Sequence, residues 1–400
     1  MSLPSPALRK VRRWFRKRGT FLFANLVAFS LSIGYMIGSA LPIAQSFEVA
    51  AIDTWLAIRG RVTPPGGVVL AAIDKRTYFD LKLSNLLPWP RQVNTELLKR
   101  FKRAGARRAI FDIFFVDQGP DPVADREMSE ALSLLPTFIG AYATLLSAKD
   151  TTLTEVRPLE IFATKAEAVV AMTLVGGETI RNFFVQETRK SVKNPPFAPP
   201  IANAIALASA PPLAVPDERD LIYYYGPPGT FPGYSISTIL SMSDEQLISS
   251  FKDLTVIVGT QLQVDTLMKV KDSFDTPVSS APMCGVEIHA TAISNILTQQ
   301  WIRRFSKKTE DVATAALAFI LPLFILLLKP LRATALAVTS IGGWFVASYW
   351  IFLHGYLLPG RVVALVVVPS ALFISVTHFY VILRASVHEM SDGLGVDISR

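Results

Sequence analysis

Four long apolar runs lie in this chain, one near its start and three near its end. They cover residues 20–41, 312–328, 333–353 and 362–383. A helix needs about 20 apolar residues to cross a hydrocarbon layer of about 30 Å, and each run approaches or exceeds that length. We therefore expect four transmembrane helices, with residues 44–306 forming a folded domain on one side of the membrane.

The distribution of basic residues predicts which side that is. Residues 1–19 hold seven Lys and Arg residues, and no acidic residue precedes Glu48. Because Lys and Arg beside a span are retained in the cytoplasm, we expect a cytoplasmic N-terminal tail and an extracytoplasmic domain. Four spans then return the tail 384–400 to the cytoplasm. Five basic residues oppose this orientation, namely Arg303, Arg304, Lys307, Lys308 and Arg361.

A cleaved signal peptide is the alternative for the first run. The apolar core of such a peptide is about 7–15 residues long. The run at 20–41 is longer than that and follows a strongly basic segment. We therefore favour an uncleaved anchor, and the topology of the remaining chain is the same in either case.

Composition limits the classes of partner. Half of the 400 residues are hydrophobic, and much of the net charge of +8 lies in the N-terminal tail. A basic tail beside a bilayer is explained by topology and anionic lipid, so we expect contact with the lipid bilayer and no nucleic-acid binding. The one cysteine, Cys284, cannot form a disulfide within the chain. We expect it to be a buried small residue, and a disulfide between two copies is the alternative.

Apolar strands alternate with amphipathic helices in the domain. Strands are predicted at 68–73, 108–115, 137–142 and 254–258, and helices at 92–103, 124–135, 201–208 and 286–297. A hairpin is predicted around 176–177. A further strand is predicted at Tyr223–Tyr225, where it runs into a tight turn. Continuous apolar strands separated by helices indicate a parallel sheet that is covered on both faces. The fold class is therefore an α/β extracellular domain with a mainly parallel, Rossmann-like layered sheet, accompanied by four transmembrane helices.

Several separated blocks of this domain resemble one family. The blocks are FEVAAIDTWLAIRGRVTPP, VVLAAIDKRT, LPWPRQVNTELLKRFKRAGARRAIFDIFF, YYYGPPGTFPGYSI, LTVIVGT and CGVEIHATAISNIL. In this order and spacing they resemble the type-two CHASE domain, an extracellular sensory module of bacterial transmembrane receptors such as adenylate and guanylate cyclases and histidine kinases. The resemblance covers about 47–304, whereas 144–194 departs from the family pattern.

The resemblance implies a sensory receptor in the bacterial inner membrane. Its ligand would be an unknown small molecule or a state of the cell envelope, and its output would be a cyclase or kinase. Only 17 residues follow the last run, too few for a catalytic domain. We therefore expect the chain to have no catalytic activity of its own. It either acts on a cytoplasmic cyclase or kinase in trans or is a truncated receptor. Because cyclases and kinases work as dimers, we also expect a homodimer.

Motifs that would mark an enzyme are absent from the sequence. It contains no G-x-x-x-x-G-K-[ST], no G-x-S-x-G, no H-E-x-x-H and no C-x-x-C. We expect no catalytic residue, no metal site and no cofactor. A membrane scaffold or accessory protein and an exterior-facing membrane enzyme are the alternatives.

Six residues of the domain are candidates for ligand binding. Asp74 and Asp112 lie at or near the carboxyl ends of two predicted strands, where open parallel sheets bind ligands. The alternative is that each caps a helix or pairs with an arginine. The other candidates, each with a structural role as its alternative, are Arg91, Tyr225, Glu287 and His289.

The segment between the first run and the domain is the candidate for signal coupling. Its candidate residues are Phe47, Asp53, Trp55 and Arg59. Phe47, Ile52 and Trp55 are available for one face of a helix over about 44–58. We expect the first span to continue outward as a signalling helix.

Overall fold

The structure is a computed structural model. It describes residues 42–84, 89–144, 154–174, 179–183, 198–217, 219–262, 272–327 and 330–360, together with residues 30, 33, 34 and 38. The chain divides into two compact units. The α/β unit is Leu56–Arg303, and the helical unit is Met1–Trp55 with Arg304–Arg400.

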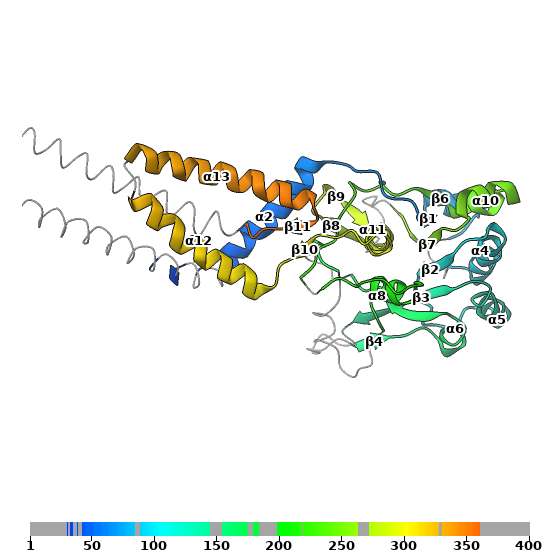
Figure 1. Cartoon of the computed structure of the whole chain (residues 1–400). Coiled ribbons are helices and arrows are strands. Elements are labelled where there is room, and N and C mark those ends of the chain that lie inside the picture. The colour runs from blue at the N-terminus through cyan, green and yellow to red at the C-terminus, as the bar shows by residue number, and fades with distance from the viewer. Residues whose placement is uncertain are drawn as a thin grey trace, which may run out of the picture. The chain divides into compact units, whose positions relative to one another are not determined.

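A seven-stranded sheet forms the centre of the α/β unit (Figure 1). Its order is β4-β3-β2-β7-β1-β6, and β5 also pairs with β3. The strands are β1 (Val68–Ile73), β2 (Arg108–Asp112), β3 (Thr137–Thr144), β4 (Thr154–Val156), β5 (Ala168–Ala171), β6 (Gly233–Ser235) and β7 (Thr255–Thr260). Strand β4 runs antiparallel to β3, and the other recorded pairs are parallel. The prediction of a mainly parallel α/β sheet is confirmed.

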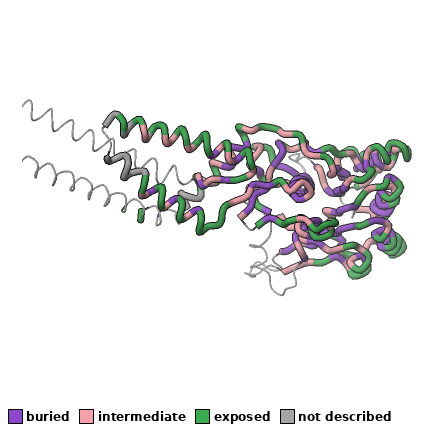
Figure 2. Tube along the Cα trace, viewed as in Figure 1, coloured by how far each residue is buried: buried purple, intermediate pink, exposed green. Residues whose placement is uncertain are grey.

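Helices cover both faces of this sheet. The first face carries α4 (Arg91–Ala104), α5 (Pro122–Ala131), α6 (Glu160–Ala163), α9 (Ile236–Ser241) and α10 (Asp244–Phe251), and the second carries α8 (Ile201–Leu207) and α11 (Gly285–Thr298). The strands are buried between them (Figure 2), which explains why their sequences are continuously apolar.

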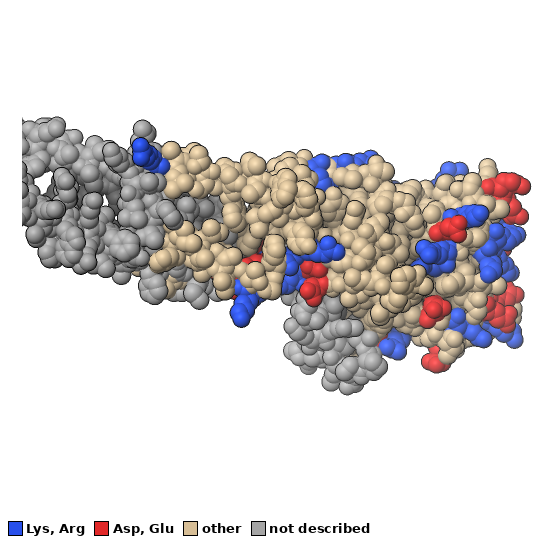
Figure 3. Space-filling view, in the orientation of Figure 1, with Lys and Arg blue, Asp and Glu red and all other residues tan. Residues whose placement is uncertain are grey.

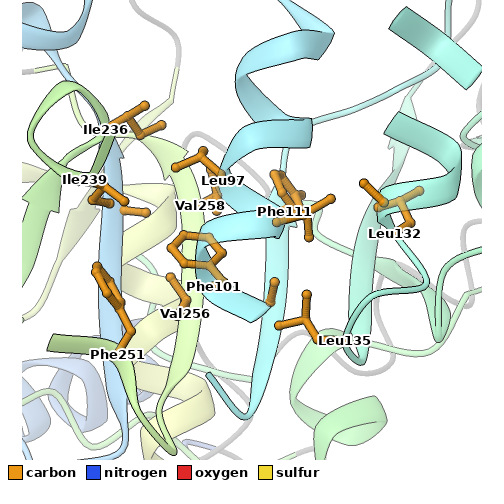
Figure 4. Close-up of a cluster of buried hydrophobic side chains, with 14 of the residues drawn as sticks. Leu97, Phe101, Phe111, Leu132, Leu135, Ile236, Ile239, Phe251, Val256 and Val258 are labelled. Atoms are coloured by element: carbon orange, nitrogen blue, oxygen red, sulfur yellow. The ribbon is translucent and has the colours of Figure 1, made fainter. Parts of the chain in front are cut away.

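Large side chains fill the core under the first face. Phe101 of α4 and Phe251 of α10 have ring centroids 5.4 Å apart, and both lie over the strand residues Val256 and Val258 of β7 (Figure 4). Helix α4 ends at Gly105, whose φ of 71° is left-handed and suits glycine. The sequence predicted this helix at 92–103, one residue shorter at each end.

The second half of the unit departs more from the predicted elements. There a hairpin of β8 (Ser273–Thr276) and β9 (Ser279–Cys284) was not predicted; in the first half the short helix α3 (Lys75–Asp80) was not predicted either. The predicted hairpin at 176–177 lies outside the described residues.

The predicted strand at Tyr223–Tyr225 is wrong, because no strand forms there. The backbone of Tyr223 bonds a side chain in place of a neighbouring strand. Its N–H donates to Oδ1 of the buried Asn295 at 2.8 Å, and Nδ2 of Asn295 donates to its carbonyl at 3.1 Å.

Three helices make up most of the described helical unit. They are α2 (Pro42–Arg59), α12 (Lys307–Leu327) and α13 (Pro330–Leu353). The part of α2 up to Trp55 belongs to this unit. Two short strands, β10 (Arg303–Arg304) and β11 (Tyr356–Leu357), precede α12 and follow α13 in the sequence. Trp55 packs against Phe345 and Tyr349 of α13. Within the described ranges, no helix combines the length and the apolar character that crossing a membrane requires. The apolar run at 362–383 and most of the run at 20–41 lie outside those ranges.

Candidate ligand site at the carboxyl edge of the sheet

The chain leaves neighbouring strands of the sheet toward opposite faces. Strand β7 lies between β1 and β2, and the chain leads from β1 and β2 to α4 and α5 on the first face. After β7 it leads through β8 and β9 to α11 on the second face. In open α/β sheets ligands bind at the carboxyl ends of strands where the connections diverge in this way. The ends of β2 and β7 are therefore the first place to look for a site.

Asp112 ends β2 and points toward the second face. Along β2, Ile110 packs under α8 and α11 while Phe111 packs under α4, and alternation places Asp112 with Ile110. Its Oδ2 is buried and has no hydrogen-bond partner among the described residues. Burial raises the pKa of this carboxyl group to about 7.

Glycine beside Asp112 allows α11 to approach the sheet closely. Gly259 of β7 is the register partner of Asp112. A Cβ atom at Gly259 would lie 2.7 Å from Cγ2 of Val286 and 3.1 Å from Cβ of Asp112. The first turn of α11 therefore rests directly on the sheet next to the buried carboxyl group.

A second carboxyl group, that of Asp272, lies at the start of α11. Its carbonyl accepts from the N–H of Gly285 at 3.2 Å, and its Oδ1 is 2.5 Å from where a Cβ atom of Gly285 would be. No described residue donates a hydrogen bond to this carboxylate. Burial and then the charge of Asp112 raise its pKa to about 7, while His289 opposes the shift.

His289 follows Gly285 by one turn of α11, so both lie on one face of that helix. Its Nε2 is 3.2 Å from the carbonyl of Met172. Burial lowers the pKa of the imidazole, so the ring is neutral near pH 7. A carbonyl only accepts hydrogen bonds, which places the ring proton on Nε2 and leaves Nδ1 as an acceptor.

Cys284 precedes α11 and is buried and free, as the sequence predicted. Burial, followed by the charges of Asp272 and Glu287, raises the pKa of its thiol to about 11. The thiol is therefore neutral, and its Sγ lies 3.9 Å from the carbonyl of Leu262. In the part of the chain that the structure describes, no three His, Cys, Asp or Glu side chains converge as metal ligands.

Asp74 has the structural role that was its alternative. It is the N-cap of α3, and its Oδ1 accepts from the N–H of Thr77 and from Oγ of Ser235, both at 2.8 Å. The structure does not bring Asp74 to Asp112, because β7 lies between their strands.

Arg91 is also structural. Its Nε is 3.0 Å from Oδ1 of Asp125, its Nη2 donates to the carbonyl of Asp117 at 2.8 Å, and its guanidinium lies 4.9 Å from the ring centroid of Phe115. A structural role was the alternative for Arg91, and the salt bridge with Asp125 is such a role.

Glu287 and Tyr225 make hydrogen bonds that hold the first turn and the last turn of α11 in the core. The buried carboxylate of Glu287 accepts from the N–H groups of Gly229, Thr230 and Phe231 at 2.9, 2.8 and 3.2 Å. The hydroxyl of buried Tyr225 bonds side chains of α11, with Nδ2 of Asn295 at 3.1 Å. Of the six predicted ligand residues, only Asp112 and His289 therefore lie in the cluster with Asp272.

The four candidate residues for signal coupling lie on a helix, α2, as predicted, and differ in their surroundings. In the helical unit Trp55 is buried, Asp53 is partly exposed, and Phe47 is 47 % exposed. The common face of Phe47, Ile52 and Trp55 for signal coupling stays a prediction. In the α/β unit, Nη2 of Arg59 donates to the carbonyl of Tyr224.

An ion-pair cluster in the helical unit adds a residue that the sequence did not single out for coupling. Nη2 of Arg304 lies 2.9 Å from Oε2 of Glu48 and 3.1 Å from Oε2 of Glu310, and all three side chains are largely buried. Burial opposes the charge of Arg304, but the two carboxylates outweigh it and raise the pKa of its guanidinium. The cluster ties α2 to the start of α12.

The fold is that of an α/β-layered domain joined in sequence to a helical unit. The chain belongs to the CHASE2 domain family, whose model matches residues 26–328. CHASE2 domains are sensor modules and are typically extracellular, so the resemblance found in the sequence is confirmed. No curated protein and no solved structure matches the chain.

Proposed function

We propose that the chain is the sensory part of a transmembrane receptor. It detects an extracytoplasmic signal and transmits it across the inner membrane to a cyclase or kinase, supplied by another protein or by a longer form of this one. Membership in a family of sensor domains is the observation that carries this proposal. In this role the chain detects a signal and catalyses no reaction.

The surface of the helical unit supports a membrane position for it. Among the large apolar side chains that α12 and α13 expose are Val312, Leu317, Ile320, Val338, Phe345, Val346 and Trp350. Figure 3 shows few charged side chains over these two helices, and those lie toward their starts. A helical surface with this many exposed apolar side chains is typical of contact with lipid. The spans are those of the four apolar runs, with both termini in the cytoplasm.

The α/β unit then lies outside and carries the site. A change at Asp112, Asp272 and His289 acts first on the start of α11, because Val286 and Gly285 pack directly against that cluster. Dimerisation of the receptor carries the change to the output, since cyclases and kinases work as dimers. Helix α2 is the second connection between the unit and the apolar helices.

The test is crosslinking of the tagged full-length protein in its native membrane, followed by purification and mass spectrometry. We expect recovery of a cyclase or kinase together with a second copy of the chain. The control is a tagged membrane protein of unrelated function at the same copy number. Recovery of this chain alone, with a crosslinked dimer but no signalling enzyme, would contradict the proposed output and favour a scaffold.

A further inference from the structure

A cavity of about 410 Å³ lies beside the start of α4, and every residue that lines it belongs to the described ranges. Its walls come from α3 and the chain just after it, from the start of α4, and from the connection between β2 and α5. Tyr78 and Trp89 of these walls pack against the core under the first face of the sheet, whereas Asp112 points toward the second face. The cavity is therefore separate from the cluster of Asp112, Asp272 and His289.

We propose that this cavity binds a small, uncharged molecule that carries a planar ring. The inference rests on the proposed function in taking such a molecule as an extracytoplasmic signal. It adds a second binding site and the chemical class of its ligand. Pockets for small molecules commonly have volumes of about 300–1,000 Å³ and are lined mainly by apolar and aromatic side chains.

The lining has this composition. Its apolar and aromatic members are Tyr78, Leu83, Trp89, Pro90, Pro120 and Ala124. The ring centroids of Tyr78 and Trp89 are 6.0 Å apart, and the planes of the two rings meet at 68°. Aromatic rings prefer edge-to-face and offset-stacked contacts, and a wall of two rings at a steep angle can offer both to a third ring. A planar ring is therefore the ligand group that suits this wall.

Charge at the cavity favours a neutral ligand. The guanidinium of Arg91 is paired with Asp125, with Nε 3.0 Å from Oδ1. The carboxylate of Asp121 caps α5 and accepts from Nε2 of Gln92 at 3.4 Å. Lys82 is exposed, so water already solvates its ammonium group. An ionic ligand would lose its own hydration in the cavity without relieving a buried, unpaired charge, and an uncharged ring avoids that cost.

The fold holds the walls of the cavity in place. The indole Nε1 of Trp89 donates to Oδ1 of Asn94 at 2.8 Å, and Asn94 is fully buried. The connection that carries Pro120 is fixed as well, because the N–H of Gly119 donates to Oδ2 of the buried Asp125 at 2.8 Å. A cavity with walls fixed in this way loses little conformational entropy when a ligand enters it.

The experiment uses the purified full-length protein in lipid nanodiscs, with 5-fluoroindole as the probe and fluorine NMR as the readout. Binding to a site broadens the probe signal and saturates, whereas partition into lipid does not saturate. We expect saturable broadening that unlabelled indole reverses. Cyclohexanol, whose ring has no flat aromatic face, should be at least about tenfold less effective as a competitor.

A filled cavity is the first variant test. Ala124 is 3 % exposed and lines the cavity, so Ala124→Leu places a larger side chain where the ring would lie. We expect an affinity at least about tenfold weaker, equivalent to about 1.4 kcal/mol. Glu127→Leu adds the same side chain at an exposed position of α5 and is the matched control, which should bind as the wild type does.

A second pair of variants tests the aromatic wall. Tyr78→Ala removes one of the two rings and should weaken binding by about three- to tenfold, whereas Tyr78→Phe keeps the ring and should bind normally. Thermal unfolding of each variant checks that it is folded.

Three results would overturn the proposal. They are the absence of saturable broadening with the wild type, equal binding by Ala124→Leu and Glu127→Leu, and equal competition by cyclohexanol and indole. Full binding by Tyr78→Ala would contradict the role of the aromatic wall. None of these outcomes bears on the crosslinking of a partner enzyme, so the proposed function fails or stands separately.

Discussion

Burying the carboxyl group of Asp112 costs folding free energy whenever that group is ionised. Its pKa is about 7 in the folded protein against an ordinary value of 3.8, so the folded state binds the proton more tightly than the unfolded chain. The resulting stability is present below about pH 4 and is lost as the pH rises to about 7. The ionised carboxyl group therefore lowers the stability of the fold at neutral and alkaline pH.

The variant Asp112→Asn removes that cost. At pH 8 it should be more stable than the wild type by at most about 4 kcal/mol, and the difference should fall as the pH is lowered toward 5. Urea unfolding of the full-length protein at a series of pH values measures this. Asp253→Asn should show no such pH dependence, and an unchanged or lower stability of Asp112→Asn at pH 8 would contradict the cost assigned to the buried carboxylate.

The sequence could predict some side-chain roles and not others. The structural roles of Arg91 and Asp74 could be given as alternatives from the sequence. Arg91 pairs with Asp125 of a predicted helix, and Asp74 caps the helix that directly follows it. The role of Asp272 could not be given, since its position depends on the β8–β9 hairpin folding back onto Gly285. No spacing in the sequence marks that contact.

Elements were predictable where the pattern was long and continuous. Strand β1 and helix α4 have the predicted bounds to within a residue, because an apolar run and a glycine C-cap define them. Strand β6 has only three residues, and the middle of β9, Ser280 to Pro282, is exposed, so neither strand has a continuous apolar pattern. The wrong strand at Tyr223–Tyr225 has the composition of a strand, but Asn295 of α11 takes the backbone bonds that a neighbouring strand would have made.

The register of α2 should matter for signalling. One alanine inserted between Asp53 and Thr54 turns the preceding part of the helix by about 100° relative to Arg59, which bonds Tyr224 of the α/β unit. We expect loss of the ligand response of the partner enzyme. A four-residue insertion nearly restores the angle and is the control. Full signalling with the single insertion would rule out coupling through α2.

The ion-pair cluster of Arg304 gives a second test at this scale. Arg304→Gln leaves the buried carboxylates of Glu48 and Glu310 facing each other, a loss of about 3–5 kcal/mol. Hydrogen exchange should then be faster in α2 and in the first turns of α12. Adding Glu48→Gln and Glu310→Gln removes the uncompensated charges and should recover part of the protection. If the triple variant exchanges as fast as Arg304→Gln, the charges are not the cause.

The orientation of the whole molecule can be tested through its single cysteine. Cys284 is buried, so the wild type gives a low background with a membrane-impermeant thiol reagent. Lys99→Cys, in exposed helix surface, should be labelled from outside intact cells, whereas Ser2→Cys should be labelled only after lysis. Labelling of both from the same side would contradict an anchored N-terminus with an exterior domain.

Helix α11 determines how far a signal must travel inside the α/β unit. Its 14 residues give a rod about 21 Å long, and its residues from Gly285 to Ile296 are all buried. The rod begins at the acidic cluster and ends at Thr298, nine positions before α12 begins at Lys307. A packed helix transmits a push along its axis with little compression. In the receptor that we propose, the input would lie at one end of this helix and the exit at the other, so a shift of Val286 along the helix axis would move Thr298 with it.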